Sequence, residues 1–325
     1  MPGYACPDIV SAAVHAGVHP VLVDLEPECP YMSLQGIRAA ISEHTIAIVA
    51  LNFLGIPERM RDLRMIADDH NLILIEDSAQ WYPDCEAPIS TSFDGDLVVL
   101  SFGKGKPVSL LGGGALLVKK NTLVDHIHPL ANPVASLPSV VKLRAILPIY
   151  NCVISPLAYW LLEALPFIEL GATRYKALTE IQALDNTRLR LLAENIRRYQ
   201  ALDLTNQQQI QATVGRYNHY LLDLPAVCNS YRGQRLLRYP ILLPTATTRN
   251  KVLTALTDAG VGASSFYPVT LPQIPGVAEL VSSHVPLRHA ADFASRLITL
   301  PTHQGVDSRH IEVIDATIKH CAETC

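Results

Sequence analysis

The chain has 325 residues, of which 49% are hydrophobic and 17% are charged. That balance is typical of a globular protein and excludes an intrinsically disordered one. The formal net charge of −4 argues against nucleic acid as the main partner, because nucleic-acid-binding proteins usually carry a basic patch. The length is sufficient for a large hydrophobic core and for two domains.

Cysteine usage and the start of the chain indicate a cytoplasmic protein. The seven cysteines are scattered, odd in number and without a Cys-x-x-Cys pair, which favours reduced thiols over a disulfide framework or a zinc site. The twelve histidines also lack the spacing of metal ligands, so we expect no metal site. Met1–Tyr4 has neither the basic residues nor the apolar stretch of a signal peptide.

Short apolar runs alternate with helical stretches over the first 120 residues. The pattern predicts helices at about 7–16, 34–41 and 60–70, with Pro57 in the first turn of the third. It predicts strands at 21–24, 46–51, 72–75, 97–100 and 115–118. Continuous apolar strands separated by helices indicate an α/β fold whose sheet is mostly parallel and covered on both faces.

A long apolar segment follows the first sheet. Residues from about 124 to 186 read as helical, and 146–168 approach the length of a membrane span, with Glu163 as their only charge. Pro148, Pro156 and Pro166 interrupt this stretch, which favours a buried or surface-docked helical pair over a span. Peripheral contact with a membrane is the less favoured alternative.

The remainder of the chain predicts a smaller α/β unit. An Arg-rich helix at 187–199 joins the two parts, and 237–243 is predicted as an edge strand because Pro240 cannot donate to a ladder. Thr247 or Thr248 is expected to cap a helix that runs to Ala259 and ends at Gly260. A last strand at 297–300 precedes a final helix at 307–321.

Two of the predicted strands end in chemically reactive side chains. Asp77 follows the strand at 72–75, with Gln80 one helical turn later, and Ser101 ends the strand at 97–100. Ligands bind beyond the carboxyl ends of strands in parallel sheets, although an isolated aspartate there more often caps a helix. A carboxylate beside a pyridine nitrogen keeps that nitrogen protonated, as pyridoxal phosphate chemistry requires.

A lysine amine completes this set of groups. Lys106 lies in a glycine-rich segment just after Ser101, with Lys104 as its rival. A lysine can form a Schiff base with pyridoxal phosphate and then move a proton at the substrate carbon. The predicted cofactor site therefore comprises Asp77, Gln80, Ser101 and a lysine, for which the residues themselves leave both Lys106 and Lys104 open.

These motifs resemble those of the DegT/DnrJ/EryC/StrS-type sugar aminotransferases. The likeness rests on Gly17–Asp24, on Thr45–Ile48 leading to Phe53–Gly55, on Glu76–Gln80, on Ser101-Phe102 with Lys106, and on Leu300–His303. It implies the aspartate aminotransferase-like fold, which is pyridoxal phosphate fold type I. The spacing in this family selects Lys106 over Lys104. By this resemblance Lys106 binds the cofactor covalently and Asp77 pairs with the pyridine nitrogen, so these two are the catalytic pair, while Gln80 lies by the ring oxygen and Ser101 contacts the phosphate.

The resemblance also implies an activity and an assembly. Such proteins transfer an amino group, often from glutamate, to the keto group of a nucleotide-linked sugar for surface polysaccharide, and they work as homodimers. We expect a large cofactor-binding domain at 1–186, with a helical insertion at about 124–186, and a small domain at 187–325.

The sequence departs from this family at several positions. From the resemblance we expect that the family's usual N-terminal segment is missing. Cys6 stands where an aromatic ring is usual, with Tyr4 nearby as a substitute, and Asn52 stands where histidine is common. The alternative reading is therefore a non-catalytic member that acts as a partner or regulatory subunit. Replacement of the Schiff-base lysine by histidine marks sugar dehydration in this family, and Lys106 argues against that reaction.

Overall fold

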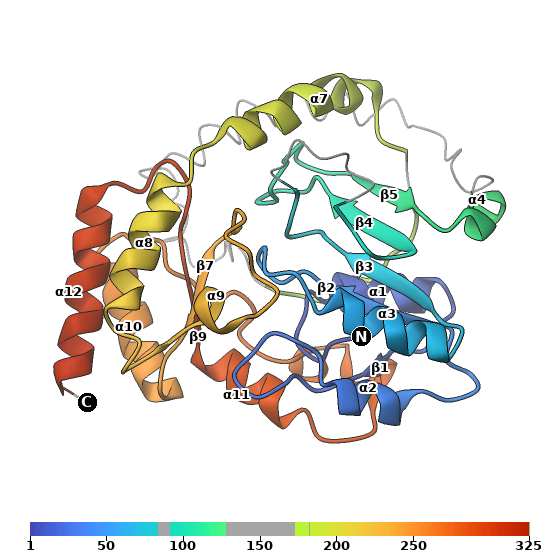
Figure 1. Cartoon of the computed structure of the whole chain (residues 1–325), viewed down its shortest axis with the longest axis horizontal. Helices are drawn as coiled ribbons and strands as arrows, with labels where there is room; N and C mark the ends of the chain where they lie inside the picture. Colours follow the sequence, from blue (N-terminus) through green and yellow to red (C-terminus); the bar gives the residue numbers. More distant parts are fainter. Residues whose placement is uncertain (84–91, 128–172, 182, 325) are drawn as a thin grey trace.

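The central sheet has four strands in the order β2-β3-β4-β5 in the computed structural model, which describes residues 1–83, 92–127, 173–181 and 183–324 (Figure 1). The strands are β2 (Ala47–Leu51), β3 (Ile73–Asp77), β4 (Leu97–Ser101) and β5 (Gly114–Val118). β2, β3 and β4 run parallel, whereas β5 is antiparallel to β4. The predicted mostly parallel α/β sheet is therefore confirmed.

Helix α3 (Met60–Asp69) covers one face of this sheet. Its buried residues Leu63 and Ile66 belong to the same apolar cluster as Ile48 and Leu74, which lie on β2 and β3. Side chains alternate between the two faces of a strand, so the residues between these buried positions face the other side. Asp77 and Ser101, the last residues of β3 and β4, lie on that second face.

Other helices and strands are also described in the N-terminal half of the chain. They are α1 (Asp8–His15), β1 (Val21–Leu22), α2 (Leu34–Ala40) and α4 (Asn121–Ile127). The expected helical character over 124–186 is confirmed for 124–127, which lie in α4, and is wrong for residues 173–181 and 183–185, which have no helical turns. The apolar segment 146–168 lies outside the described residues. Within the part that the structure describes, no helix is long and apolar enough to cross a membrane.

Helix α7 (Asn186–Ala201) arches across the top of the molecule in Figure 1, from the side of β4 and β5 towards α8. The Asp185 side chain accepts hydrogen bonds from the Thr187 and Arg188 N–H groups and so caps its first turn. The same carboxylate pairs with the Arg188 guanidinium. Burial acts to raise the pKa of Asp185, but the hydrogen bonds from the Arg188 N–H and guanidinium outweigh it, so the pKa is lowered. The helix predicted at 187–199 is confirmed.

A second sheet forms the core of the C-terminal half. Its order is β6-β7-β9, from β6 (Leu222–Asp223), β7 (Tyr239–Leu242) and β9 (Leu297–Leu300). The helices α8 (Thr205–Gly215), α10 (Ala246–Asp258) and α12 (Ser308–Thr324) lie beside it, on the left in Figure 1, and α12 contacts both α8 and α10. The other elements are α9 (Leu224–Val227), η3 (Leu271–Gln273), η4 (Ala278–Leu280), β8 (Ser282–Ser283) and α11 (Arg288–Arg296).

The prediction that Pro240 marks an edge strand is wrong, because β7 is the central strand of this sheet. Pro240 is paired with Thr299, whose own N–H and C=O groups bond to Ser264 on the far side of β9. The nitrogen of Pro240 therefore points towards β6, and β6 ends opposite Ile241. No ladder hydrogen bond is lost, so a proline is tolerated in the middle of the sheet.

Two other details of the helix ends differ from expectation. Thr245, rather than Thr247 or Thr248, caps α10 by accepting a hydrogen bond from the Thr248 N–H. Helix α3 begins at Met60, so Pro57 precedes its first turn. Both errors concern the exact residue at which a helix begins. Neighbouring residues near a helix start are similar in sequence, so the sequence does not fix this residue.

A single large apolar cluster connects the two halves of the chain. It contains Tyr4 and Phe53 from the N-terminal half and Phe293 from α11, whose rings contact one another with centroids 5.3–5.8 Å apart. β1 also pairs in parallel with β8. The division into domains at residue 186 remains a prediction.

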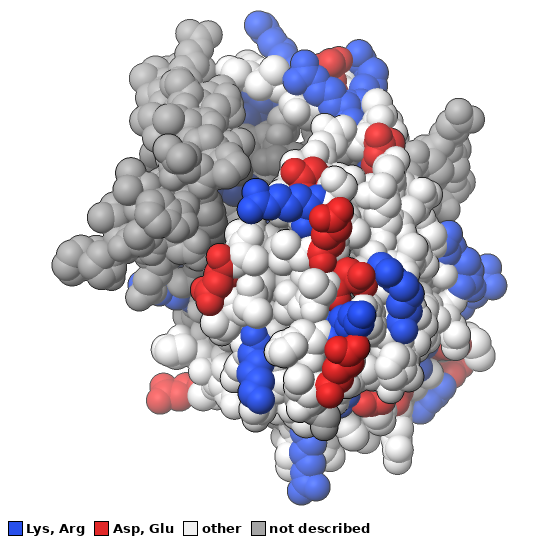
Figure 2. Space-filling view, turned by 90° about the vertical axis from the view of Figure 1, so that its left-hand side faces the viewer, with Lys and Arg blue, Asp and Glu red and all other residues white. Residues whose placement is uncertain are grey.

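Charges of both signs alternate on the face formed by the C-terminal helices (Figure 2). One example is the ion pair between Arg216 and Asp315, at 3.2 Å. This face therefore lacks the broad basic surface that nucleic-acid binding requires.

Asp24 connects the N-terminal half to α11, and its removal should destabilise the protein. This buried carboxylate accepts hydrogen bonds from the backbone N–H groups of Leu25, His289 and Ala290 at 2.8–3.0 Å. The last two groups lie in the first turn of α11, which has no side-chain cap of its own. We expect Asp24→Ala to lower the free energy of unfolding by about 3 kcal/mol in urea titrations, since bonds to charged groups are strong.

Asp292→Ala is the matched control for this prediction. Asp292 lies on the same helix but pairs with Arg296 at the surface, half exposed, so its loss should cost less than about 1 kcal/mol. Equal destabilisation by the two variants would show that Asp24 does not hold α11 in place.

Candidate active site

Asp77 and Ser101 lie near each other on one face of the central sheet. In the parallel register of β3 and β4, Asp77 is opposite Val99, and Ser101 follows two residues later on the same face. Both residues are partly exposed. Glu76 and Leu100, which directly precede them on β3 and β4, are buried on the other face. The register therefore brings a carboxylate and a hydroxyl to the carboxyl ends of adjacent strands, as the sequence predicted.

Lys106 reaches the same place from the loop that follows β4. Its backbone N–H bonds to the Gly103 carbonyl at 3.4 Å, which closes a turn. A Cβ atom added to Gly103 would lie 3.4 Å from Ser101 Oγ and 3.7 Å from Lys106 Cγ. Gly103 thus leaves a small open space between the hydroxyl and the lysine side chain. Lys104, the rival lysine, is exposed.

The charges of Asp77 and Lys106 act on each other. Burial raises the pKa of Asp77 above its ordinary value, because the anion loses water, and the nearby Lys106 ammonium partly offsets that rise. Asp77 Oδ1 accepts the Ala79 N–H at 3.0 Å, and among the described residues its other oxygen accepts no hydrogen bond. That oxygen is available to a cationic N–H group of a ligand.

Gln80 is held more tightly by the protein than the sequence indicated. Its side chain is 1% exposed; its carbonyl oxygen accepts the Leu54 N–H at 2.9 Å and its amide donates to the Tyr267 hydroxyl at 3.0 Å. One amide hydrogen remains for another acceptor. The structure therefore places Gln80 beside the strand ends, but as a group that also links the two halves of the chain.

Tyr4 belongs to the core rather than to an open binding face. It is 2% exposed, its ring packs against Phe53, Tyr267 and Phe293, and its hydroxyl donates to the Tyr267 carbonyl at 2.9 Å. Cys6 is half-buried nearby, and burial together with Asp8 raises the pKa of its thiol, while Lys106 lowers it. Cys6 thus lies near the charged groups of the candidate site. Tyr4 packs in the core, so it does not substitute for the aromatic ring that is usual at the position of Cys6.

Asn52 organises the ends of β2 and β3, a role that the sequence did not reveal. Its amide nitrogen donates to Glu76 and Ser78, both at 2.9 Å, and its oxygen accepts the Glu58 N–H at 3.1 Å. Its backbone N–H bonds to the Asp77 carbonyl at 3.0 Å. This fully buried residue fixes the backbone from which the Asp77 side chain projects.

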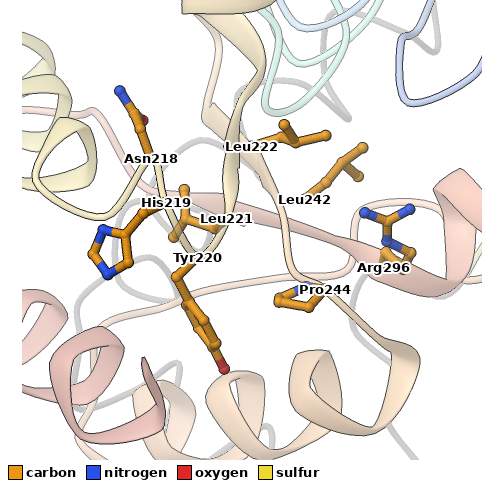
Figure 3. A pocket seen from close by; sticks show the side chains of 8 residues that line it. All are labelled: Asn218, His219, Tyr220, Leu221, Leu222, Leu242, Pro244 and Arg296. Carbon is orange, nitrogen blue, oxygen red and sulfur yellow. The ribbon is translucent and has the colours of Figure 1, made fainter. Parts of the chain in front are cut away.

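A hollow in the C-terminal half is too small for a substrate site. This cavity, of about 130 Å³, is lined mainly by residues that precede β6 and by the ends of β6 and β7 (Figure 3). Its one cation, Arg296, already bonds to Glu28, Asp292 and the Leu243 carbonyl. Ligand sites are typically about 300–1,000 Å³ in volume, so we assign no function to this cavity.

The residues at the strand ends fit pyridoxal phosphate. The Asp77 carboxylate, with one oxygen that accepts no hydrogen bond from the described residues, suits its pyridine nitrogen. A lysine suits its aldehyde, and the Ser101 hydroxyl beside Gly103 suits its phosphate. These groups come from the end of β3, the end of β4 and the loop that follows β4.

Comparison with known proteins bears on the same residues. The model of the DegT/DnrJ/EryC1/StrS aminotransferase family matches residues 7–319. The chain belongs to this family. The predicted resemblance is confirmed, and the match includes the strand ends with Asp77 and Ser101 as well as the Lys106 loop.

Solved structures show the same fold. The chain superposes on DesV of S. venezuelae with a TM-score of 0.72 and 17% identity, over 99% of this chain and 77% of that one. An aminotransferase of this family from Brucella abortus gives a TM-score of 0.69 and 19% identity, over 98% and 78%. The predicted fold type of this family member is thereby confirmed.

Curated relatives align over a shorter stretch. A UDP-N-acetyl-3-dehydro-alpha-D-glucosamine 3-aminotransferase from Acidithiobacillus ferrooxidans is 30% identical over 35% of this chain and 31% of its own length. A GDP-perosamine synthase from Vibrio cholerae is 27% identical over 38% and 34%. The alignments therefore span about a third of these relatives.

Proposed function

We propose that the protein is a pyridoxal phosphate-dependent aminotransferase that acts on the keto group of a nucleotide-activated sugar. The observation that carries this proposal is the convergence of Asp77, Ser101 and Lys106 at the carboxyl ends of β3 and β4. Membership of an aminotransferase family supports the same reaction class.

When bound, pyridoxal phosphate supplies an electron sink for the bond that breaks at the amino-bearing carbon. Lys106 would hold the cofactor covalently and, once free, its amine would move a proton at that carbon. Asp77 would keep the ring nitrogen protonated by ion pairing, and Ser101 would donate to the phosphate. Gln80 would direct its remaining amide hydrogen to the ring oxygen.

The substrate class follows from the relatives. A UDP-linked keto sugar and the GDP-sugar perosamine figure in the names of two of them, and a lipopolysaccharide biosynthesis protein of Salmonella typhimurium is a third. We therefore propose a nucleotide-linked keto sugar as acceptor, glutamate as donor and surface polysaccharide as the product's destination. We also propose that the enzyme works in the cytoplasm as a homodimer.

Cofactor binding is the first test. Titration of the purified protein with pyridoxal phosphate should produce the visible absorbance of a lysine adduct, and borohydride reduction should place a pyridoxyl group on Lys106 by peptide mass spectrometry. Adduct formation at another lysine, or none at all, would contradict the assignment.

Turnover distinguishes the proposal from a non-catalytic partner subunit. With 15N-glutamate and a panel of UDP-, GDP- and dTDP-linked keto sugars, we expect 15N in the sugar product by mass spectrometry. Glutamine serves as the alternative donor. A protein that binds the cofactor but transfers nitrogen to none of these sugars would favour the regulatory role instead.

A further inference from the structure

Two cysteine thiols far apart in the sequence lie next to each other in the structure. Cys29 Sγ and Cys228 Sγ are 3.8 Å apart, although 199 residues separate them along the chain. Cys29 is half-buried, in the loop after β1, and Cys228 is buried at the end of α9. Neither residue belongs to the candidate active site.

A second set of contacts holds the same two segments together. Two residues after each cysteine, the Tyr31 hydroxyl donates to Ser230 Oγ at 2.5 Å and accepts the Ser230 N–H at 3.1 Å. Ser230 Oγ in turn donates to the Pro57 carbonyl. The Arg59 guanidinium lies 5.0 Å from the centre of the Tyr31 ring. These bonds fix the backbones that carry the two thiols, so the short approach of the sulfurs is built into the fold.

We propose that Cys29 and Cys228 form a reversible disulfide when the protein meets a low-molecular-weight peroxide. The Cys29 thiolate attacks one peroxide oxygen, the O–O bond breaks, and the other oxygen leaves as hydroxide and becomes water. Cys228 sulfur then attacks Cys29 sulfur, the S–O bond breaks, Cys228 loses its proton, and water leaves. Both thiols are oxidised, and their two electrons reduce the peroxide.

The surroundings favour Cys29 as the sulfur that reacts first. Its hydrogen bond from Cys228 lowers the pKa of the Cys29 thiol, against the opposing effect of burial, and Arg59 lowers it further while Glu58 raises it. The same shared proton raises the pKa of Cys228. Cys29 is also the more exposed of the two, so a small oxidant reaches it first.

The disulfide would close a loop that contains the whole candidate active site. Asp77, Ser101 and Lys106 all lie between residues 29 and 228. Such a loop restricts the unfolded chain strongly, and the bond would tie the segment after β1 to the C-terminal half. The proposal does not depend on the aminotransferase reaction, and its test requires no substrate.

The test is oxidation of the native, full-length protein with hydrogen peroxide. We expect the number of titratable thiols to fall by two, and non-reducing gels to show a monomer that migrates faster because its denatured chain is cross-linked. Peptide mass spectrometry should show the fragment with Cys29 joined to the fragment with Cys228. Dithiothreitol should restore both thiols.

Single variants identify the partners. Cys29→Ser and Cys228→Ser should each abolish the fast-migrating species, whereas Cys321→Ser, which alters another buried cysteine, should retain it. The peptide map is obtained on the unaltered protein, so it tests the Cys29–Cys228 disulfide even if a variant misfolds. Overoxidation of Cys29 without a cross-link, or pairing of either cysteine with a third one, would overturn the proposal.

Discussion

Lys106→Ala should reduce amino transfer by at least about 10²–10⁴-fold, because the residue would both hold the cofactor and move the proton during the reaction. The variant should also lose the absorbance of the covalent adduct while keeping the wild-type circular dichroism spectrum. The measurement is kcat for transfer from glutamate, together with a spectral titration with pyridoxal phosphate.

Lys104→Ala is the matched control, since this exposed lysine lies two residues earlier in the same loop. It should retain the adduct and a rate within about threefold of the wild type, as expected for a surface substitution. If the adduct persisted in Lys106→Ala and vanished in Lys104→Ala, the roles of the two lysines would be reversed.

Asp77→Asn should lower kcat by about 10²–10³-fold, a loss comparable to that of one pre-organised electrostatic partner. The amide has nearly the shape of the carboxylate, so the backbone of β3 should remain in place. It carries no charge, however, and cannot keep a pyridine nitrogen protonated. We expect the cofactor adduct to form but with a shifted absorption maximum, which a purely structural effect would not produce.

Asp94→Asn provides the comparison for Asp77→Asn. Asp94 is exposed and lies just before β4, where its backbone N–H donates to Glu76. Its replacement should leave kcat and the absorption maximum unchanged. Equal kcat values for the wild type and Asp77→Asn would remove Asp77 from the catalytic pair.

The sequence was most informative where the relevant signal is local. Strands β2, β3, β4 and β5 and the helices between them follow from apolar runs and their spacing, and the structure has them within a few residues of the prediction. The reactive residues at the ends of β3 and β4 could also be predicted from the sequence, because the alternation of side chains along a strand is a property of the strand alone. Their roles remain predictions.

Tertiary structure decided the groups whose partners lie far away in the chain. Asp24 caps a helix that begins 264 residues later, and nothing near Asp24 marks it as a cap. Gln80 and Tyr267, 187 residues apart, meet only because the two halves share one core. Pro240 was misassigned because the sequence cannot show that β6 ends before it reaches the proline nitrogen.

The amino-acid sequence by itself determined the family, the type of sheet and the order of the reactive residues, because apolar periodicity and short motifs act over a few residues. Only the fold decided which of those residues share a face, which are held by distant hydrogen bonds, and that Cys29 lies against Cys228. Those contacts depend on strand register and on packing between segments that no local pattern encodes.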